Sequence, residues 1–354
     1  MTWEYHTGFE SQLVPLGWDP VGSTPSIETD SPNSGGAYLR QTYGRFDDPQ
    51  WDSSQLFQRP GTASSDANSA TLGMAMRIND LAATEAIVGA LYFTGTNQTA
   101  YIGWSIESDG SISVRAGRST TIGDIILGTS GPGVIAEGEW YDIEIRCLPD
   151  NAAGFYELAV NGSTLLSGTG VDTNPLTIGS LSTGVGWSID INRVTSGGDD
   201  TCDFDDFRIG GGFTGLQGVK VHELLTPAST TENDGVVTGA ATAHEATDEV
   251  PGSDTDFVTL SGDGDRLLMG LSNRTETGDV DSVQATLTAS AVSGSPVAFP
   301  IFEEGGTETD GDQLVLTGAS NTSYSSALST NPRTGLAWTS ADINALEIGV
   351  RRAN

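Results

Sequence analysis

Residues 137–166 read EGEWYDIEIRCLPDNAAGFYELAVNGSTLL and carry the clearest structural signal in the chain. In the first half, Tyr, Ile and Cys side chains alternate with Asp, Glu and Arg, which is typical of a strand with one buried face and one wet face. In the second half, Asn161-Gly162 separates two apolar runs and favours the type I′ turn of a β-hairpin. The stretch predicts antiparallel β-structure in which Cys147 points into the core.

The same pattern continues on both sides of this stretch. Asp109-Gly110 lies between two alternating runs and predicts a second hairpin of the same type. We expect further strands near residues 70–78, 99–106, 176–179, 185–191 and 204–209. These strands are enough for two packed sheets.

Helical signals are few. Good helix formers run from Asn79 to Ala90, and Thr339-Ser340-Ala341-Asp342 has the spacing of a capping box that opens a short helix through Leu346. The polar stretch from Thr226 to Asp256 predicts a long surface connection or a sheet-edge excursion. We expect C-terminal strands near residues 217–225, 256–260, 282–292, 312–316 and 346–351.

The length of 354 residues suggests two domains. A glycine run at 210–212 follows an expected strand and marks the boundary. We therefore predict an all-β protein with a β-sandwich at residues 1–212 and a smaller β-sandwich with one short helix at residues 213–354.

Charge is the unusual feature of the composition. The chain has 15 basic residues, of which Lys220 is the one lysine, against 47 acidic residues, for a net charge of -32. The acidity is spread over both predicted domains and repels nucleic acids and anionic membranes, so we expect neither as a partner. Such a surface fits a halophilic or marine protein that needs salt for stability, and an acidic extracellular or particle-surface protein is the alternative.

Targeting and redox signals are weak. No run of about 18 apolar residues occurs, so we expect no membrane insertion, and the start of the chain lacks the pattern of a signal peptide. Cys147 and Cys202 lack the spacing of a zinc site and are expected as buried thiols, with one disulfide left open.

Motifs for catalysis and metal binding are mostly missing. His6, His222 and His244 are far apart in the sequence, and we expect none to bind a metal or act as a base. No GxSxG or P-loop motif occurs. Asp203, Asp205 and Asp206 are candidate calcium ligands, against the alternative of a solvated acidic surface, and no other cofactor is expected.

A resemblance covers residues 5–210. The Gly138–Tyr141 strand with its Asn161-Gly162 hairpin, together with residues 8–18 and 202–209, resembles concanavalin A-like or laminin-G-like jelly-roll domains. The resemblance implies a jelly-roll sandwich, and many such domains bind glycans or proteins through loops at one sheet edge.

The jelly-roll glucanases of this fold set Glu, Asp and Glu on alternate residues of one strand. Here Asp142 and Glu144 share a face, but Trp140 and Arg146 stand at the neighbouring alternate positions and break the triplet. A glycoside hydrolase is therefore kept as an alternative only.

A second resemblance covers most of the chain. VKVHELLTP at 219–227 and the segment 331–351 resemble the structural proteins of tailed viruses of bacteria or archaea. This resemblance implies a virion component, such as a capsid decoration, fibre or minor tail protein, that binds capsid or tail proteins.

We therefore expect a non-enzymatic structural protein, located in the virion and forming homo-oligomers, whose jelly roll projects from the particle. A carbohydrate-binding module for host-surface glycans is the first alternative. Trp338 is a candidate assembly contact, although a core position is favoured for it, as it is for Trp51 and Trp104, which could stack on sugars.

Overall fold

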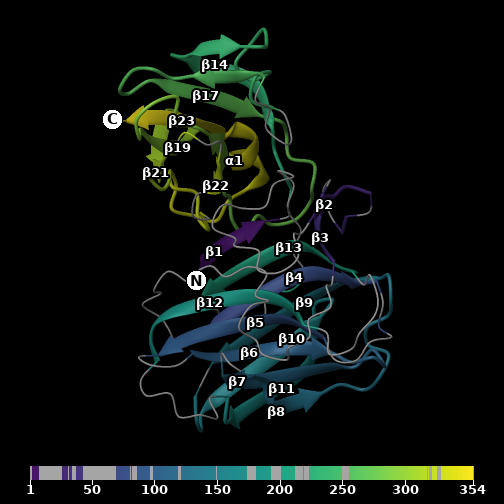
Figure 1. Cartoon of the computed structure of the whole chain (residues 1–354). Helices are drawn as coiled ribbons and strands as arrows, with labels where there is room; N and C mark the ends of the chain where they lie inside the picture. The colour runs from purple at the N-terminus through teal and green to yellow at the C-terminus, as the bar shows by residue number, and fades with distance from the viewer. Residues whose placement is uncertain are drawn as a thin grey trace. The chain divides into compact units, whose positions relative to one another are not determined.

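The computed structural model in Figure 1 divides the chain into two compact units, the first mainly Gly17–His222 and the second mainly Glu223–Asn354. Strands build both units, which confirms the predicted all-β class. The structure describes residues 2–7, 26–30, 32–33, 37–42, 69–79, 81, 86–95, 99–118, 121–148, 150–173, 181–192, 201–211, 218, 223–248, 255–316, 318, 321–324 and 328–353.

The first unit contains two antiparallel sheets. The large sheet has eight strands in the order β11-β10-β9-β4-β13-β3-β2, with β1 paired to β13. Its strands are β1 (Thr2–Thr7), β2 (Ser26–Glu28), β3 (Tyr38–Thr42), β4 (Ala70–Ile78), β9 (Trp140–Leu148), β10 (Gly154–Val160), β11 (Ser163–Val171) and β13 (Thr201–Gly211). The small sheet has the order β12 (Leu181–Asn192), β5 (Ala86–Gly95), β6 (Thr99–Ile106), β7 (Ile112–Arg118) and β8 (Thr121–Thr129).

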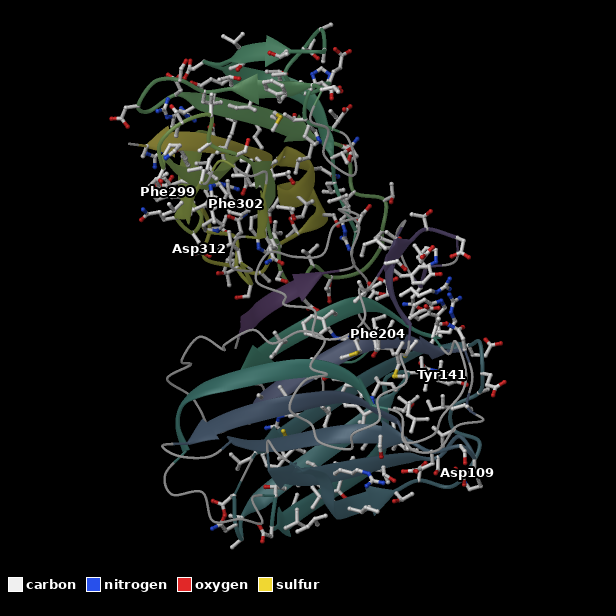
Figure 2. The ribbon with its side chains drawn as sticks, viewed as in Figure 1. Asp109, Tyr141, Phe204, Phe299, Phe302 and Asp312 are labelled. Carbon is white, nitrogen blue, oxygen red and sulfur yellow. The ribbon has the colours of Figure 1, made fainter. Side chains whose placement is uncertain are left out.

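The core of the first unit is built from alternate residues of both sheets. On β9, Ile143, Ile145 and Cys147 are fully buried, as the alternation predicts. Trp104 of β6 and Phe204 of β13 are also fully buried, and Figure 2 labels Phe204. Burial of each large apolar side chain contributes about 1.5–3 kcal/mol to folding.

The two predicted hairpin turns differ in outcome. Asn161 and Gly162 have φ angles of 50° and 74°, which confirms the type I′ turn between β10 and β11. The hairpin predicted at Asp109-Gly110 is confirmed by the antiparallel pairing of β6 with β7, but its turn is not type I′, because Gly110 has a φ of 75° and Asp109 is not in the left-handed region. There the Gly110 amide donates to the carbonyl of Glu107 and the Asp109 carboxylate accepts from the Ser111 amide, which makes a longer loop.

The helix expected from Asn79 to Ala90 is also wrong, since β5 begins at Ala86. Pairing with β6 on one side and β12 on the other outweighs the helical propensity of single residues. The strand expected at 176–179 lies outside the described residues.

The second unit centres on a six-stranded antiparallel sheet. Its order is β14 (Pro227–Asn233), β17 (Arg266–Leu271), β23 (Glu347–Ala353), β19 (Val297–Glu304) and β20 (Thr307–Asp310), with β21 (Leu314–Val315) paired to β19. Two ribbons add β15 (Val236–Thr238) with β16 (Phe257–Thr259), and β18 (Thr286–Ala289) with β22 (Asn321–Tyr324).

The predicted capping box is confirmed. The Thr339 side chain accepts from the Asp342 amide at 3.2 Å, and the Asp342 carboxylate accepts from the Thr339 amide at 2.9 Å. These two bonds begin helix α1 (Ser340–Ala345), the one helix among the described residues. None of the described segments forms a helix long and apolar enough to cross a membrane.

The strand expected near residues 217–225 lies mostly outside the described residues, and its described part, 223–225, forms no strand. The stretch after Thr226 begins with β14 at the end of the sheet, which agrees with the predicted sheet-edge excursion and not with its alternative, a surface connection. Strand β14 reads PASTTEN and lacks the apolar alternation of a buried strand. A polar strand fits this position, because β14 ends the sheet and pairs with β17 only, among the described strands.

Candidate functional site on the large sheet

The face of β9 that the sequence predicts to be solvent-exposed is buried. Asp142 is 6% exposed and Glu144 is 1% exposed, although both point to the outer face of the large sheet, opposite the apolar core. Buried charges need partners of opposite sign, because desolvation of an unpaired carboxylate is costly.

The partner of both carboxylates is Arg208 of β13. Its two terminal nitrogens donate to the two Asp142 oxygens at 2.9 Å each, and Nη2 also lies 3.3 Å from Glu144 Oε2. The Arg208 side chain is 2% exposed. We call these three residues the Arg208 cluster, a bidentate pair with a second carboxylate added.

A glycine makes the Arg208 cluster possible. In the sheet register Arg208 lies beside Gly73 of β4, and Gly73 lies beside Glu144 of β9. The arginine therefore crosses a whole strand, and a Cβ on Gly73 would lie 2.6 Å from its guanidinium carbon. The register shift between Asp205 and Arg208 on β13 places the arginine for this crossing.

The Arg208 cluster also holds the chain that follows β13, since Arg208 Nη2 donates to the Gly218 carbonyl at 3.1 Å. Burial alone would lower the pKa of Arg208, but the charges of Asp142 and Glu144 outweigh it and the pKa is raised. Arg208 is therefore a permanent cation. A guanidinium beside a carboxyl group favours the ionised form, the opposite of what a general acid requires.

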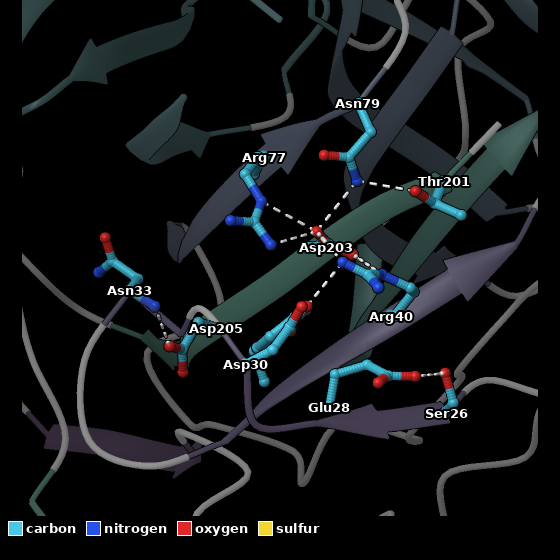
Figure 3. A network of polar contacts seen from close by, with 11 residues as sticks. Ser26, Glu28, Asp30, Asn33, Arg40, Arg77, Asn79, Thr201, Asp203 and Asp205 are labelled. Atoms are coloured by element: carbon cyan, nitrogen blue, oxygen red, sulfur yellow. Dashed lines mark hydrogen bonds and ion pairs between the residues drawn. The ribbon is translucent and has the colours of Figure 1, made fainter. Parts of the chain in front are cut away.

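A second group, the Asp203 network, lies on the same outer face and is drawn in Figure 3. Asp203 is fully buried, and Arg40 Nε donates to its Oδ1 at 2.8 Å. Its Oδ2 accepts from Arg77 Nη2 at 2.7 Å and from Asn79 Nδ2 at 3.0 Å. Both oxygens are thus occupied by donors from the neighbouring strand β3 and from β4 and the residue after it.

The Asp203 network is a single cross-strand row. Arg40, Asp203, Arg77 and Trp140 are direct neighbours in the registers of β3, β13, β4 and β9. The Arg77 guanidinium lies 4.8 Å from the centroid of the Trp140 ring. The row ties the short edge strands to the centre of the large sheet.

An aromatic pair borders this row. Tyr38 and Trp140 meet edge to face with ring centroids 5.7 Å apart, and the Tyr38 hydroxyl donates to Asp30 at 2.6 Å. Burial and this hydrogen bond raise the pKa of Tyr38 to about 12. The same bond lowers the pKa of Asp30.

In the structure, the three carboxylates predicted as calcium ligands have other partners. Asp203 is held by two arginines, and the carboxylates of Asp205 and Asp206 accept from the backbone and side-chain nitrogens of Asn33. Among the described residues no group of three His, Cys, Asp or Glu side chains could hold a metal ion. Calcium at Asp203, Asp205 and Asp206 stays a prediction, and no contact in the structure favours it.

The candidate tryptophans lie in cores. Trp338 is 4% exposed, packs with Phe302, Ile343 and Leu346, and donates from Nε1 to the Leu328 carbonyl at 2.8 Å. Trp338 therefore has the core position that was favoured for it, and its burial does not favour an assembly contact, which stays a prediction. Trp104 is a core residue too, and Trp51 lies outside the described residues.

The remaining candidates have structural roles. Cys147 and Cys202 are buried and form no disulfide with each other, since they lie beside opposite ends of β4 in the register. His244 contacts the hydroxyls of Thr230 and Thr242. His222 and the side chain of His6 lie outside what the structure describes.

Sequence reasoning missed the arginines that complete the site. Arg40, Arg77 and Arg208 are separated from their carboxylate partners by 163, 126 and 66 residues. Their position inside strands was a weak signal, because Arg115 and Arg146 also lie inside strands.

Comparison with known proteins gives a likeness of fold. No protein-family model matches the sequence, and no curated protein matches it either. Alginate lyase vAL-1 from Chlorella virus is 12% identical, with 55% of this chain and 92% of that chain covered and a TM-score of 0.38. The basic winged bean lectin is 13% identical, with 59% of this chain and 98% of that chain covered and a TM-score of 0.34.

A third similar structure is the carbohydrate esterase vb_24B_21 from the Shiga toxin-encoding bacteriophage phi24B. It is 15% identical, with 55% of this chain and 89% of that chain covered and a TM-score of 0.35. Lyases, lectins and an esterase thus share this degree of likeness, which concerns the fold and assigns no activity to this chain.

Proposed function

We propose that the chain is a non-enzymatic structural component of a tailed-virus particle. The second unit attaches to capsid or tail proteins, and the first unit projects as a β-sandwich module. The sequence resemblance of segments 219–227 and 331–351 to virion proteins supports this assignment. An all-β chain with many acidic residues also suits a static module on the outside of a particle.

One observation carries the non-enzymatic part of the proposal, namely the Arg208 cluster. Asp142 and Glu144 are the two carboxylates that the sequence suggests for glycoside hydrolysis. That reaction needs two carboxyl groups beside the scissile bond, one as general acid and the other as base or nucleophile. Here both face one buried arginine, and the pair is almost shielded from solvent. Their charge is used to hold three strands of the large sheet together.

The Asp203 network supports the same conclusion. Its central carboxylate is fully buried and already accepts hydrogen bonds from two arginines and an asparagine. A group in this state neither transfers a proton to a ligand nor coordinates one without loss of these bonds. Both charged groups on the outer face therefore stabilise the fold.

Glycan binding is the second candidate, and Trp140 favours it. This half-buried ring lies at the border of the Asp203 network, beside Arg77 and the hydroxyl-bearing Tyr38. An aromatic ring next to polar hydrogen-bonding groups is a usual composition for a small-molecule site.

The test is proteomic and structural. Purified virus particles are analysed by quantitative mass spectrometry and cryo-electron microscopy, and we expect this chain at a fixed copy number in capsid or tail density. The isolated protein is offered polysaccharides and a glycan array in parallel. Absence from the particles would overturn the proposal, as would polysaccharide cleavage that the variant Glu144→Gln abolishes. Retention on the array that Trp140→Ala abolishes would favour the glycan-binding alternative.

A further inference from the structure

One hydrogen-bond donor of Arg208 is left without an acceptor. A guanidinium has five N–H groups. Nη1 donates to Asp142 Oδ2 at 2.9 Å and to the Asp206 carbonyl at 3.3 Å. Nη2 donates to Asp142 Oδ1 at 2.9 Å and to the Gly218 carbonyl at 3.1 Å, and it also lies 3.3 Å from Glu144 Oε2. The fifth group, Nε–H, is buried and has no hydrogen-bond partner in the part of the chain that the structure describes.

A second buried polar atom in the same state lies on the same face of the large sheet. Thr71 of β4 is fully buried, and its hydroxyl oxygen has no hydrogen-bond partner among the described residues. Such atoms are rare in native structures, because each one loses its hydrogen bonds to water on folding. Trp104, Arg266 and Arg352 each have one too, but these three lie in different sheets or on opposite sheet faces.

The strand register brings Thr71 and Arg208 close together. Arg208 lies directly beside Gly73 of β4, and its guanidinium crosses that glycine, since a Cβ there would lie 2.6 Å from Nε. Thr71 precedes Gly73 by two residues and shares its face, at a spacing of about 6–7 Å along the strand. One water molecule with two hydrogen bonds of about 2.9 Å spans a gap of this size.

The direct neighbours of Thr71 leave room beside its hydroxyl. Gly210 on β13 has no side chain, and Arg146 on β9 directs its guanidinium to the ring of Phe155, 4.3 Å from the centroid. Because Thr71 and Arg208 are 0% and 1% exposed, a molecule at this position is shielded from bulk solvent.

The charges around this position favour a neutral molecule. The Arg208 cluster contains two carboxylates and one guanidinium, so its net negative charge disfavours an anion. The Nε–H group disfavours a cation, because it presents a partial positive charge. Water accepts from an N–H group and donates to oxygen, and a buried water usually makes about three hydrogen bonds.

We propose that one buried water molecule bridges Arg208 Nε to the Thr71 hydroxyl and completes the Arg208 cluster. The water accepts from Nε–H and is hydrogen-bonded to Thr71 Oγ1. The carboxylate of Glu144, which lies beside Gly73 in the register, offers an acceptor for its second proton. The inference stands on the cluster itself and does not depend on the proposed role in a virus particle.

A crystal structure of the full chain, at a resolution that shows ordered waters, tests the position directly. We expect density for one water within hydrogen-bond distance of Arg208 Nε and Thr71 Oγ1. In the variant Thr71→Val we expect this density to weaken or disappear, because the water loses one of its partners.

Thermal melting of the first unit gives the second readout. Thr71→Val removes the hydroxyl and keeps the branched shape of the side chain. If the hydroxyl binds the water, we expect a melting temperature lowered by about 2–4 °C, the shift typical of one hydrogen bond in a domain of this size. If the hydroxyl has no partner, its removal raises the melting temperature, because a buried polar group without a hydrogen bond is costly.

Two matched substitutions calibrate this measurement. Thr173 is also fully buried, and its hydroxyl donates directly to the Leu148 carbonyl at 2.7 Å, so Thr173→Val gives the loss for a direct bond. Exposed Thr164 on β11 of the same sheet gives the effect of valine on strand preference alone, as Thr164→Val.

Two outcomes would overturn the proposal. These are a wild-type crystal structure without an ordered water between the two atoms, and a Thr71→Val variant that melts at or above the temperature of Thr164→Val. Circular dichroism verifies that each variant is folded. If Thr71→Val is not, Thr71→Ser, which keeps a hydroxyl, and Thr71→Ala, which removes it, provide the same comparison.

Discussion

Arg208 in the first unit and Arg266 in the second unit have the same kind of partners in different surroundings. The side chain of Arg208 is 2% exposed and lies between the side chains of Asp142 and Glu144, which are 5% and 1% exposed. Arg266 is 27% exposed beside Glu232 and Glu308, at 39% and 30%. The same chemical pairing is thus enclosed in one unit and accessible to water and salt in the other.

This difference decides what each pair does for stability. When a buried pair loses one partner, the remaining charge stays desolvated, at a cost of about 3–5 kcal/mol. An exposed ion pair contributes about 0–1 kcal/mol, because water and salt replace the lost partner. Arg208 therefore has a structural role, and Arg266 tunes the surface.

The largest effect is expected for Arg208→Met. The substitution leaves two carboxylates buried without their cation, so the free energy of unfolding of the first unit falls by about 3–5 kcal/mol. Chemical denaturation followed by tryptophan fluorescence measures the change. Arg266→Met is the matched control in the second unit, and equal losses in the two variants would contradict the comparison.

A smaller loss is expected for Gly73→Ala. The new Cβ would lie 2.6 Å from the Arg208 guanidinium, so the arginine must shift away from its partners, at about 1–3 kcal/mol. Thermal melting measures this loss of stability. Gly131→Ala serves as control, since a Cβ there meets nothing within 4 Å. A Gly73→Ala variant as stable as this control would show that Arg208 does not need the glycine.

Salt separates the two kinds of pair further. For Arg266→Met we expect a loss of about 1 kcal/mol or less in dilute buffer, and at about 1 M salt the loss disappears because the Debye length is about 3 Å. The loss in Arg208→Met persists at both salt concentrations. Melting curves at the two ionic strengths decide, and a loss in Arg266→Met that molar salt does not change would contradict the exposed assignment.

The smallest effect is a pH-dependent gain in stability from the substitution Glu347→Gln. Burial and the nearby Glu303 raise the pKa of Glu347 above its ordinary value of 4.5. The ionised carboxylate is therefore disfavoured in the folded state, so stability is full below 4.5 and is lost as pH rises through the raised pKa. We expect Glu347→Gln to raise the melting temperature at neutral pH and not in acid.

Exposed Glu139 of the first unit provides the control for this pH series, as Glu139→Gln. A gain in Glu347→Gln that persists unchanged in acid would exclude repulsion from Glu303 as its cause.

Local patterns predicted strands in both units. In the second unit, the strands expected near residues 256–260, 282–292, 312–316 and 346–351 coincide with β16, β18, β21 and β23. Strands β4 and β6 have the expected limits, because their apolar residues alternate and turn residues bound them. The patterns did not predict β17 and β19, and for β14 they indicated either a surface connection or a sheet-edge excursion. These strands depend on their neighbours for hydrogen bonds more than on a periodic pattern of their own.

The amino-acid sequence by itself determined the acidic charge, the all-β class, the type I′ turn at Asn161-Gly162 and the capping box at Thr339. Each of these depends on residues close together in the chain, so local chemistry is sufficient. The tertiary structure alone decided that Asp142, Glu144 and Asp203 are buried and bound to arginine. Strand register brings together residues that are 66 to 163 positions apart in the sequence. Whether a sheet face is exposed to solvent depends on what covers it.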